Sequence, residues 1–205
     1  MSHATTLVDY EVADGVAILT LTNAPANAYS YAMMQQLDRW ILEARMDESV
    51  HVLLLTGEGE KFFCAGADIA MLQELTPTRK YYFCLHANET LARLEQTPKL
   101  VIAALNGHTV GGGLEVAMGC DMRIARQGRG KIGLPEVHLG VLPGTGGTQR
   151  LTRMIGKAKA IELMAEGRNL TFEEGLELGL INRVVEAESA IDFKAKAVEW
   201  ARSFC

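Results

Sequence analysis

The chain has 205 residues, which is enough for one domain with a well-buried core. Apolar residues make up 48% of it and charged residues 22%, as in ordinary globular proteins, and no apolar run approaches the roughly 20 residues that span a bilayer. The net charge of −5 argues against a nucleic-acid surface, which needs clustered Lys and Arg. We therefore expect a protein that binds neither nucleic acid nor membrane, although backbone N–H groups could still hold a polyanionic ligand.

The start of the chain and its cysteines indicate the compartment. Residues 1–6 have neither the basic start nor the apolar core of a signal peptide, so we expect a cytoplasmic protein or the mature part of an organellar one. The four cysteines, Cys64, Cys84, Cys120 and Cys205, are scattered without a CxxC pair. In a reducing compartment such cysteines are mostly small buried apolar groups. We expect no metal site.

Strand-like and helix-like segments alternate along the chain. Runs of apolar and β-branched residues predict buried strands at 16–21, 52–56, 100–105, 122–125 and 181–185. Helical spacing of apolar residues predicts helices at 31–46, 78–94, 151–155, 158–165 and 191–202, and a short one begins near Leu114. Thr171 and Glu174 have the spacing of a capping box. The pattern favours an α/β architecture in a single domain over residues 1–205.

Three glycine-rich turns each follow a predicted strand. They are residues 63–68, residues 111–115, and residues 134–136 with 142–147. Glycines leave the backbone without Cβ atoms, so a ligand can approach its N–H groups closely, and a helix that begins there adds a positive dipole end. Two N–H groups that converge from two such turns would form an oxyanion hole. One such turn alone is more often only a tight turn.

Two glutamates stand beside these turns. Glu115 comes just after three consecutive glycines, and Glu136 follows Pro135 in a mostly apolar stretch. Partial burial would raise the pKa of a carboxyl group at either position. Two carboxyl groups with separated pKa values can share one water, one as base and the other as acid. Either glutamate alone is more often a surface residue, but the pair has the groups needed to add water across a conjugated double bond.

Five segments, in order and near the usual spacing, resemble those of the crotonase (enoyl-CoA hydratase/isomerase) superfamily. They are residues 23–28, 63–69, 103–107, 111–115 and 143–151, and the likeness runs from about Leu7 to about Ala201. The resemblance implies repeated β-β-α units wound into a spiral, assembled as a homotrimer or hexamer. Family chains usually continue into further helices, so we expect the helical lid that closes the fold, from about residue 191 onward, to be incomplete here.

The resemblance also implies roles for individual residues. Ala67 N–H and Gly112 N–H occupy the positions of the oxyanion hole, Gly144 that of a water-positioning N–H, and Glu115 and Glu136 those of the catalytic pair. Segments that line the coenzyme A groove contain Ala26, Ala28, Ala65, Asp68, Ile69 and Gly111. The implied partner is an acyl-CoA thioester, with coenzyme A as part of the substrate and no tightly bound cofactor. Because Gly112 lies at the implied thioester position, we expect Gly112→Val to cost activity far more than stability.

The leading hypothesis is an enoyl-CoA hydratase that converts a trans-2-enoyl-CoA to a 3-hydroxyacyl-CoA. A Δ3-Δ2 enoyl-CoA isomerase, which needs one carboxylate, is the nearest alternative, followed by another acyl-CoA thioester enzyme of the same fold. A catalytically silent CoA-binding or assembly protein is the alternative from a different class. Fold does not fix the reaction, so the presence of both Glu115 and Glu136 decides this ranking.

We expect three other sequence features to have no catalytic or ligand-binding role. Residues 128–133 spell G-x-G-x-x-G, but Pro135 follows at once and no helix start is present, so we expect a surface loop rather than a dinucleotide site. His138 has no ligand cluster around it and is interpreted as structural. Cys64 lies in the first motif without a nucleophile elbow or a His partner, which favours a packing role.

Overall fold

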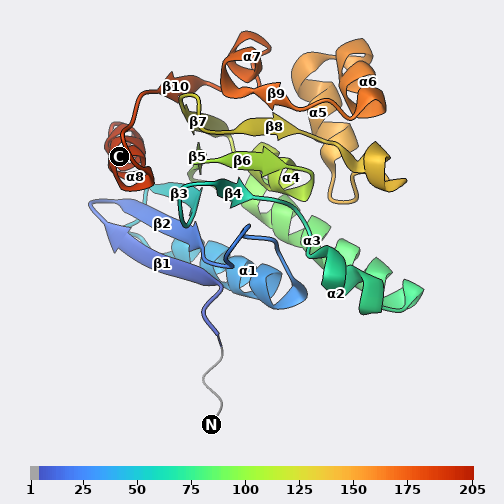
Figure 1. Cartoon of the computed structure of the whole chain (residues 1–205). Helices are drawn as coiled ribbons and strands as arrows, with labels where there is room; N and C mark the ends of the chain where they lie inside the picture. Colours follow the sequence, from blue (N-terminus) through green and yellow to red (C-terminus); the bar gives the residue numbers. More distant parts are fainter. Residues whose placement is uncertain (1–4) are drawn as a thin grey trace.

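The structure is a computed structural model, and it describes residues 5–205. Two sheets form its frame (Figure 1). The six-stranded sheet has the order β1 (Val8–Ala13), β2 (Val16–Leu21), β3 (Val52–Gly57), β5 (Leu100–Leu105), β7 (Met122–Arg126), β10 (Arg183–Val185). The four-stranded sheet has the order β4 (Phe62–Cys64), β6 (His108–Val110), β8 (Lys131–Gly133), β9 (Leu170–Thr171). The signal-peptide prediction rests partly on residues 1–4, which lie outside the described residues.

Helices cover these sheets and fill the connections. They are α1 (Tyr31–Met46), α2 (Ile69–Glu74), α3 (Pro77–Glu95), α4 (Gly112–Met118), η1 (Glu136–Leu139), α5 (Gly147–Ile155), α6 (Lys157–Glu166), α7 (Phe172–Glu177) and α8 (Ala190–Arg202). The predicted capping box at the start of α7 is confirmed, with Thr171 and Glu174 each accepting from the other's backbone N–H. No helix within residues 5–205 combines the length and apolarity needed to cross a membrane.

Three consecutive β-β-α units stack in the molecule. The units begin with β3–β4, β5–β6 and β7–β8, and each pair of equivalent strands lies parallel to the next in its own sheet. In Figure 1 the successive units lie one above another, coloured from cyan through green to yellow. This is the predicted spiral of β-β-α repeats, and it confirms the α/β fold class.

Strands β2, β3 and β5 are apolar over most of their length because both faces of the larger sheet are covered. Helix α8 packs Phe193, Ala197 and Ala201 onto one face, against buried Leu54 of β3 and Ile102 of β5. Helices α1, α3 and α4 contribute to the core cluster on the other face. A strand buried on both sides reads as a continuous hydrophobic run rather than an alternating one, which made these strands easy to predict.

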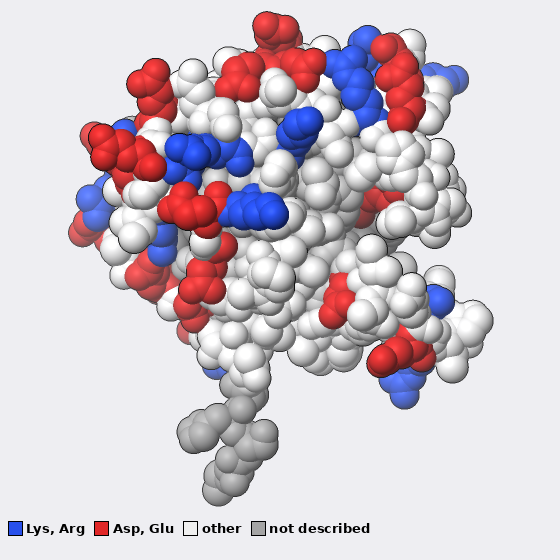
Figure 2. Space-filling model, in the orientation of Figure 1, with Lys and Arg blue, Asp and Glu red and all other residues white. Residues whose placement is uncertain are grey.

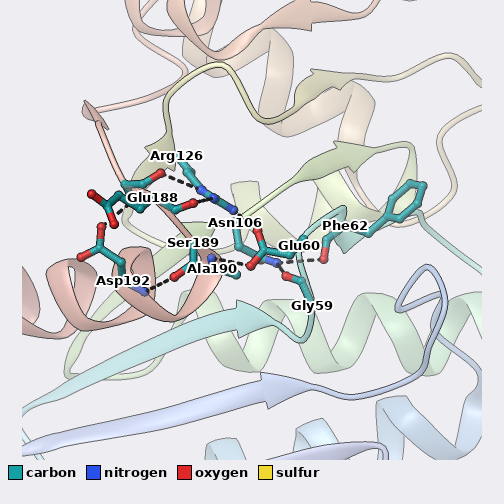
Figure 3. Close-up of polar contacts among 10 residues, drawn as sticks. Gly59, Glu60, Phe62, Asn106, Arg126, Glu188, Ser189, Ala190 and Asp192 are labelled. Atoms are coloured by element: carbon teal, nitrogen blue, oxygen red, sulfur yellow. Dashed lines mark hydrogen bonds and ion pairs between the residues drawn. The ribbon is translucent and has the colours of Figure 1, made fainter.

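A buried arginine attaches the start of α8 to the sheets (Figure 3). The side chain of Arg126, at the end of β7, is 1% exposed. Its guanidinium donates to the carbonyl oxygens of Ala187 at 3.3 Å and Glu188 at 2.8 Å, and it pairs with Glu60. The other oxygen of Glu60 accepts from Ala190 N–H at 2.8 Å. The guanidinium therefore provides hydrogen-bond donors for two backbone carbonyl groups just before α8, which lie outside the strands.

Three expectations need correction. The glycine-rich turns follow the short strands β4, β6 and β8, not the longer strands of the six-stranded sheet. Residues 131–133 form β8, so the segment 128–133 is not simply a surface loop; a Cβ atom on Gly130 would lie 2.5 Å from the ring of Phe172. Cys64 and Cys120 are buried as expected, whereas Cys205 is exposed. Three-residue strands are too short to show a hydrophobic period, which is why they were missed.

Candidate active site

The order of the smaller sheet brings the three motif turns together. Strands β4, β6 and β8 are parallel neighbours, so their carboxyl ends lie at one edge of the sheet. The chain leaves them into residues 65–68, 111–113 and 134–136. Gly111 N–H donates to Gly133 O at 2.9 Å, which fixes the second turn beside the third. Segments that are far apart in the sequence thereby share one site.

The two N–H groups assigned to the oxyanion hole lie in converging turns. Tyr29 N–H donates to Gly66 O at 2.8 Å and Asp68 N–H donates to Tyr29 O at 3.0 Å. In such a parallel bridge the residue between the two partners, Ala67, directs its own N–H away from Tyr29. Gly112 is the first residue of α4, where N–H groups have no acceptor within the helix. A Cβ atom on Gly66 would lie 3.0 Å from Gly112 N, so the two turns are in close backbone approach.

Glycine is required at position 112 because of the neighbouring Tyr29 side chain, not only because of the implied thioester position. A Cβ atom there would lie 2.2 Å from the Tyr29 hydroxyl and 2.7 Å from its ring, and Tyr29 is buried. A valine side chain would therefore collide with the core before it reached a thioester. Gly112→Val is therefore expected to cost stability as well as activity, through contact with Tyr29 rather than only through the thioester position.

Glu115 lies in the first turns of α4 and is almost fully buried, with 1% of the residue exposed. Its Oε1 accepts from Thr145 N–H and from Gly147 N–H, both at 2.7 Å. Burial raises the pKa of the Glu115 carboxyl, while these two N–H donors, the Thr145 hydroxyl and the charge of Arg150 oppose the rise. With Oε1 held by two donors, Oε2 is the atom left to accept a hydrogen bond from water.

Glu136 is half-buried at the start of η1, and its carboxyl lies against the second motif turn. A Cβ atom on Gly111 would lie 3.1 Å from Glu136 Oε1. Oε2 is buried without a hydrogen-bond partner in the described structure. Burial raises the pKa of Glu136 to about 7, and the negative charge of Glu115 adds to the rise. Glu115 is thus close enough for its charge to affect the ionisation of Glu136.

Gly144 lies on an exposed loop opposite Glu115 and is held from α3. Asn88 donates from Nδ2 to Gly144 O at 2.8 Å and to Cys84 O at the same distance. One and three residues further along, Thr145 and Gly147 supply the N–H groups that bind Glu115. The loop is therefore fixed both to α3 and to the carboxylate, and the positioning of water by Gly144 N–H stays a prediction.

The residues assigned to the coenzyme A groove lie in two adjoining segments and the Gly111 turn. Ala65 N–H donates to Ala26 O at 3.0 Å, and Ala28 O accepts from Asn23 Nδ2 at 2.6 Å. Asp68 caps α2 by accepting from Met71 N–H at 3.1 Å, and the following Ile69 is 53% exposed. Figure 2 shows a hollow between the part of the molecule that carries α2 and the part that carries η1, α5 and α6, with carboxylate atoms on its wall. An open groove here suits a long substrate.

Sequence reasoning did not single out Tyr29, Asn88 or Thr145. Tyr29 and Thr145 stand within or beside quoted motifs, so their position was the available signal; Asn88 gave none. His138 donates from Nε2 to Glu166 O of α6 at 3.2 Å, in keeping with a structural role. Burial raises the pKa of the Cys64 thiol to about 12, which makes it a poor nucleophile. Within residues 5–205, no three His, Cys, Asp or Glu residues form a group that could hold a metal ion.

Solved structures share this arrangement. An enoyl-CoA hydratase from Geobacillus kaustophilus aligns with a TM-score of 0.92 and 41% identity over 98% of this chain and 75% of that one. An enoyl-CoA hydratase from Bacillus anthracis aligns with a TM-score of 0.91 and 35% identity over 97% and 76%. The chain therefore has the fold of the crotonase superfamily.

Comparison with known sequences identifies the family within this superfamily. The family model described as enoyl-CoA hydratase/isomerase matches residues 11–205, so the chain belongs to that family. A probable enoyl-CoA hydratase of Bacillus subtilis is 41% identical over 184 residues, which are 89% of this chain and 70% of that protein. A short-chain-enoyl-CoA hydratase of Clostridium acetobutylicum is 43% identical over 172 residues, which are 83% of this chain and 66% of that protein. The chain thus spans about two thirds of the length of these relatives.

Proposed function

We propose that this protein is an enoyl-CoA hydratase that adds water to a trans-2-enoyl-CoA and releases a 3-hydroxyacyl-CoA. The observation that supports this most directly is the pair of neighbouring carboxyl groups with different surroundings. Glu115 accepts two short N–H hydrogen bonds, whereas Glu136 has a buried oxygen without a partner and a pKa of about 7. Two such carboxyl groups beside one water can divide the base and acid roles.

The reaction then follows from the assigned atoms. Glu115 takes a proton from water as the water oxygen bonds to the β-carbon, and the electrons of the double bond move toward the thioester oxygen. Ala67 N–H and Gly112 N–H donate to that oxygen as negative charge develops, which is worth several kcal/mol in a dry site. Glu136 gives its proton to the α-carbon, and exchange with solvent restores both carboxyl groups. One water is added and no cofactor is consumed.

The substrate's coenzyme A part lies, in this proposal, along the segments of Ala26, Ala28, Ala65, Asp68 and Ile69, with Gly111 at the thioester end. Relatives named as enoyl-CoA hydratases support a coenzyme A thioester as substrate. Assembly as a homotrimer or hexamer, a cytoplasmic location and one domain over residues 1–205 stay predictions.

Incubation with crotonyl-CoA tests the proposal, because hydration removes the ultraviolet absorbance of the conjugated thioester. We expect Glu115→Gln to lower hydration by roughly 10²–10⁴-fold, the range for one acid/base group, yet to keep some exchange of the α-proton with solvent. Glu136→Gln should lose both. Binding of a saturated acyl-CoA should change little in either variant, and Glu177→Gln, at an exposed glutamate of α7, is the matched control.

The outcomes separate the alternatives. Near wild-type hydration by Glu115→Gln would remove the role assigned to Glu115. Interconversion of 3-enoyl and 2-enoyl forms by the wild-type protein, without hydration, would instead identify an isomerase that relies on Glu136. Tight binding of acyl-CoA without turnover by the wild-type protein would indicate a silent binding protein.

A further inference from the structure

Tyr29 contacts both oxyanion-hole turns and the residue that binds Glu115, although no step of the mechanism uses it. It lies between β2 and α1 and is 4% exposed. Its backbone N–H and C=O bind the residues on either side of Ala67, at 2.8 Å to Gly66 and 3.0 Å from Asp68. Those bonds set the orientation of one oxyanion N–H.

The side chain of Tyr29 reaches the other two parts. Its hydroxyl and ring lie directly against the Cα of Gly112, since a Cβ atom there would be 2.2 Å from the hydroxyl oxygen. The same hydroxyl lies 3.1 Å from Thr145 Oγ1. Thr145 in turn donates its N–H to Glu115 Oε1 at 2.7 Å, and its hydroxyl favours the ionised form of Glu115. A single side chain therefore connects the second oxyanion N–H with the carboxylate.

We propose that Tyr29 is a positioning residue that acts through Thr145 to hold Glu115 ionised and correctly oriented for activating water. The Tyr29 hydroxyl is hydrogen-bonded to Thr145 Oγ1, which fixes the Thr145 side chain, and the same residue donates its backbone N–H to the carboxylate of Glu115. The proposal goes beyond the two glutamates and rests on the proposed hydratase function.

The phenol itself does not act as a base. Burial and the nearby charge of Glu115 raise the pKa of Tyr29 well above its ordinary value of 10.0, so the side chain stays neutral. Its ring already fills the space beside Phe83, with ring centroids 6.0 Å apart. A phenylalanine would keep this packing and lose only the hydroxyl, so Tyr29→Phe isolates the connection to Thr145.

The kinetic test compares Tyr29→Phe with Tyr10→Phe. Tyr10 also has a buried hydroxyl, but that hydroxyl has no partner among the described residues, and its ring stacks on Trp40 away from the site. We expect Tyr29→Phe to lower kcat for crotonyl-CoA by roughly 3–10-fold with little change in KM, the range for one neutral hydrogen bond. The acidic limb of the kcat profile should move to higher pH, because Glu115 then takes up a proton more readily. Tyr10→Phe should change neither.

Variants at Thr145 test the connection itself. Thr145→Val keeps the backbone N–H and removes the hydroxyl, so it should reproduce the Tyr29→Phe effects, and the double variant should be no worse than either single one. Thr145→Ser should restore the wild-type profile. Additive losses in the double variant, or an unshifted acidic limb in Tyr29→Phe, would overturn the proposal and leave Tyr29 as a packing residue.

A second readout does not depend on turnover. The carboxyl carbon of Glu115 can be titrated by NMR in protein labelled with ¹³C at glutamate, with Glu115→Gln to assign the signal. The apparent pKa should be higher in Tyr29→Phe than in the wild type, and an unchanged value would contradict the proposal. If the wild type fails to hydrate crotonyl-CoA while the NMR shift is present, the proposed function fails and the Tyr29 connection stands.

Discussion

Replacing Glu136 by glutamine should make the protein more stable at alkaline pH although it removes the proposed catalytic acid. The pKa of Glu136 is about 7 in the folded protein, against an ordinary value of 4.5. Between these two values the folded state binds more protons than the unfolded chain, so the free energy of unfolding falls as pH rises through that window. Below about pH 4.5 this loss is absent, and above about pH 7 it is complete.

The size of the effect follows from the same difference. A shift of about 2.5 units corresponds to about 3.4 kcal/mol for a group fully shielded from water. Glu136 is only half-buried, so solvent screening reduces the expected cost of its charge to about 1–2 kcal/mol. A neutral glutamine removes this cost. For a chain of this size the gain equals about 2–8 °C in Tm.

Denaturant unfolding at about pH 5 and about pH 8, followed by circular dichroism, measures the difference. The free energy of unfolding of Glu136→Gln relative to wild type should increase by about 1–2 kcal/mol between the two conditions. Glu177→Gln, at an exposed position, should show no such increase. Equal behaviour of Glu136→Gln at both pH values would refute the argument that burial of this carboxyl disfavours its charge.

Two further predictions concern residues whose burial the structure explains. Gly112→Val should abolish hydration and also lower the free energy of unfolding by about 2–4 kcal/mol, because its side chain would collide with buried Tyr29; wild-type Tm would contradict this. Arg126→Met should cost about 3 kcal/mol by leaving the carbonyl groups of Ala187 and Glu188 unpaired. Thermal unfolding should show a far smaller loss for Glu60→Gln, since Glu60 is largely exposed, and equal losses would contradict the assigned role of the carbonyl contacts.

The sequence predicted most of the long elements, although it missed the edge strand β1, and it predicted the short ones poorly. Helix α1 has the predicted bounds because its apolar residues repeat at helical spacing over four turns, and its first turn is capped by Ser30. Strands β4, β6 and β8 have three residues each, and such strands are defined by their partners rather than by their own pattern. The predicted turns were therefore correct, but the sheet that orders them was not visible.

In the candidate site, too, the sequence shows some features and not others. Glycine runs and glutamates beside them are local features, and local features can be recognised in a sequence. The contact between Tyr29 and Thr145 joins residues 116 positions apart and has no spacing that could announce it. A tyrosine at this position predicts only that its ring is buried and that its hydroxyl has a hydrogen-bond partner. The structure identifies that partner as Thr145 Oγ1.

The two glutamates have different surroundings, as the proposed division into a base and an acid requires. Two carboxyl groups in equivalent surroundings would have the same affinity for a shared proton. Here the hydrogen bonds differ: Glu115 accepts from two backbone N–H groups, whereas Glu136 keeps a buried oxygen without a donor. The charge of Glu115 also adds to the rise in the pKa of Glu136, after the larger effect of burial. The loop that holds Glu115 thus affects the protonation of its neighbour, and any change that weakens those donors acts on both carboxyl groups.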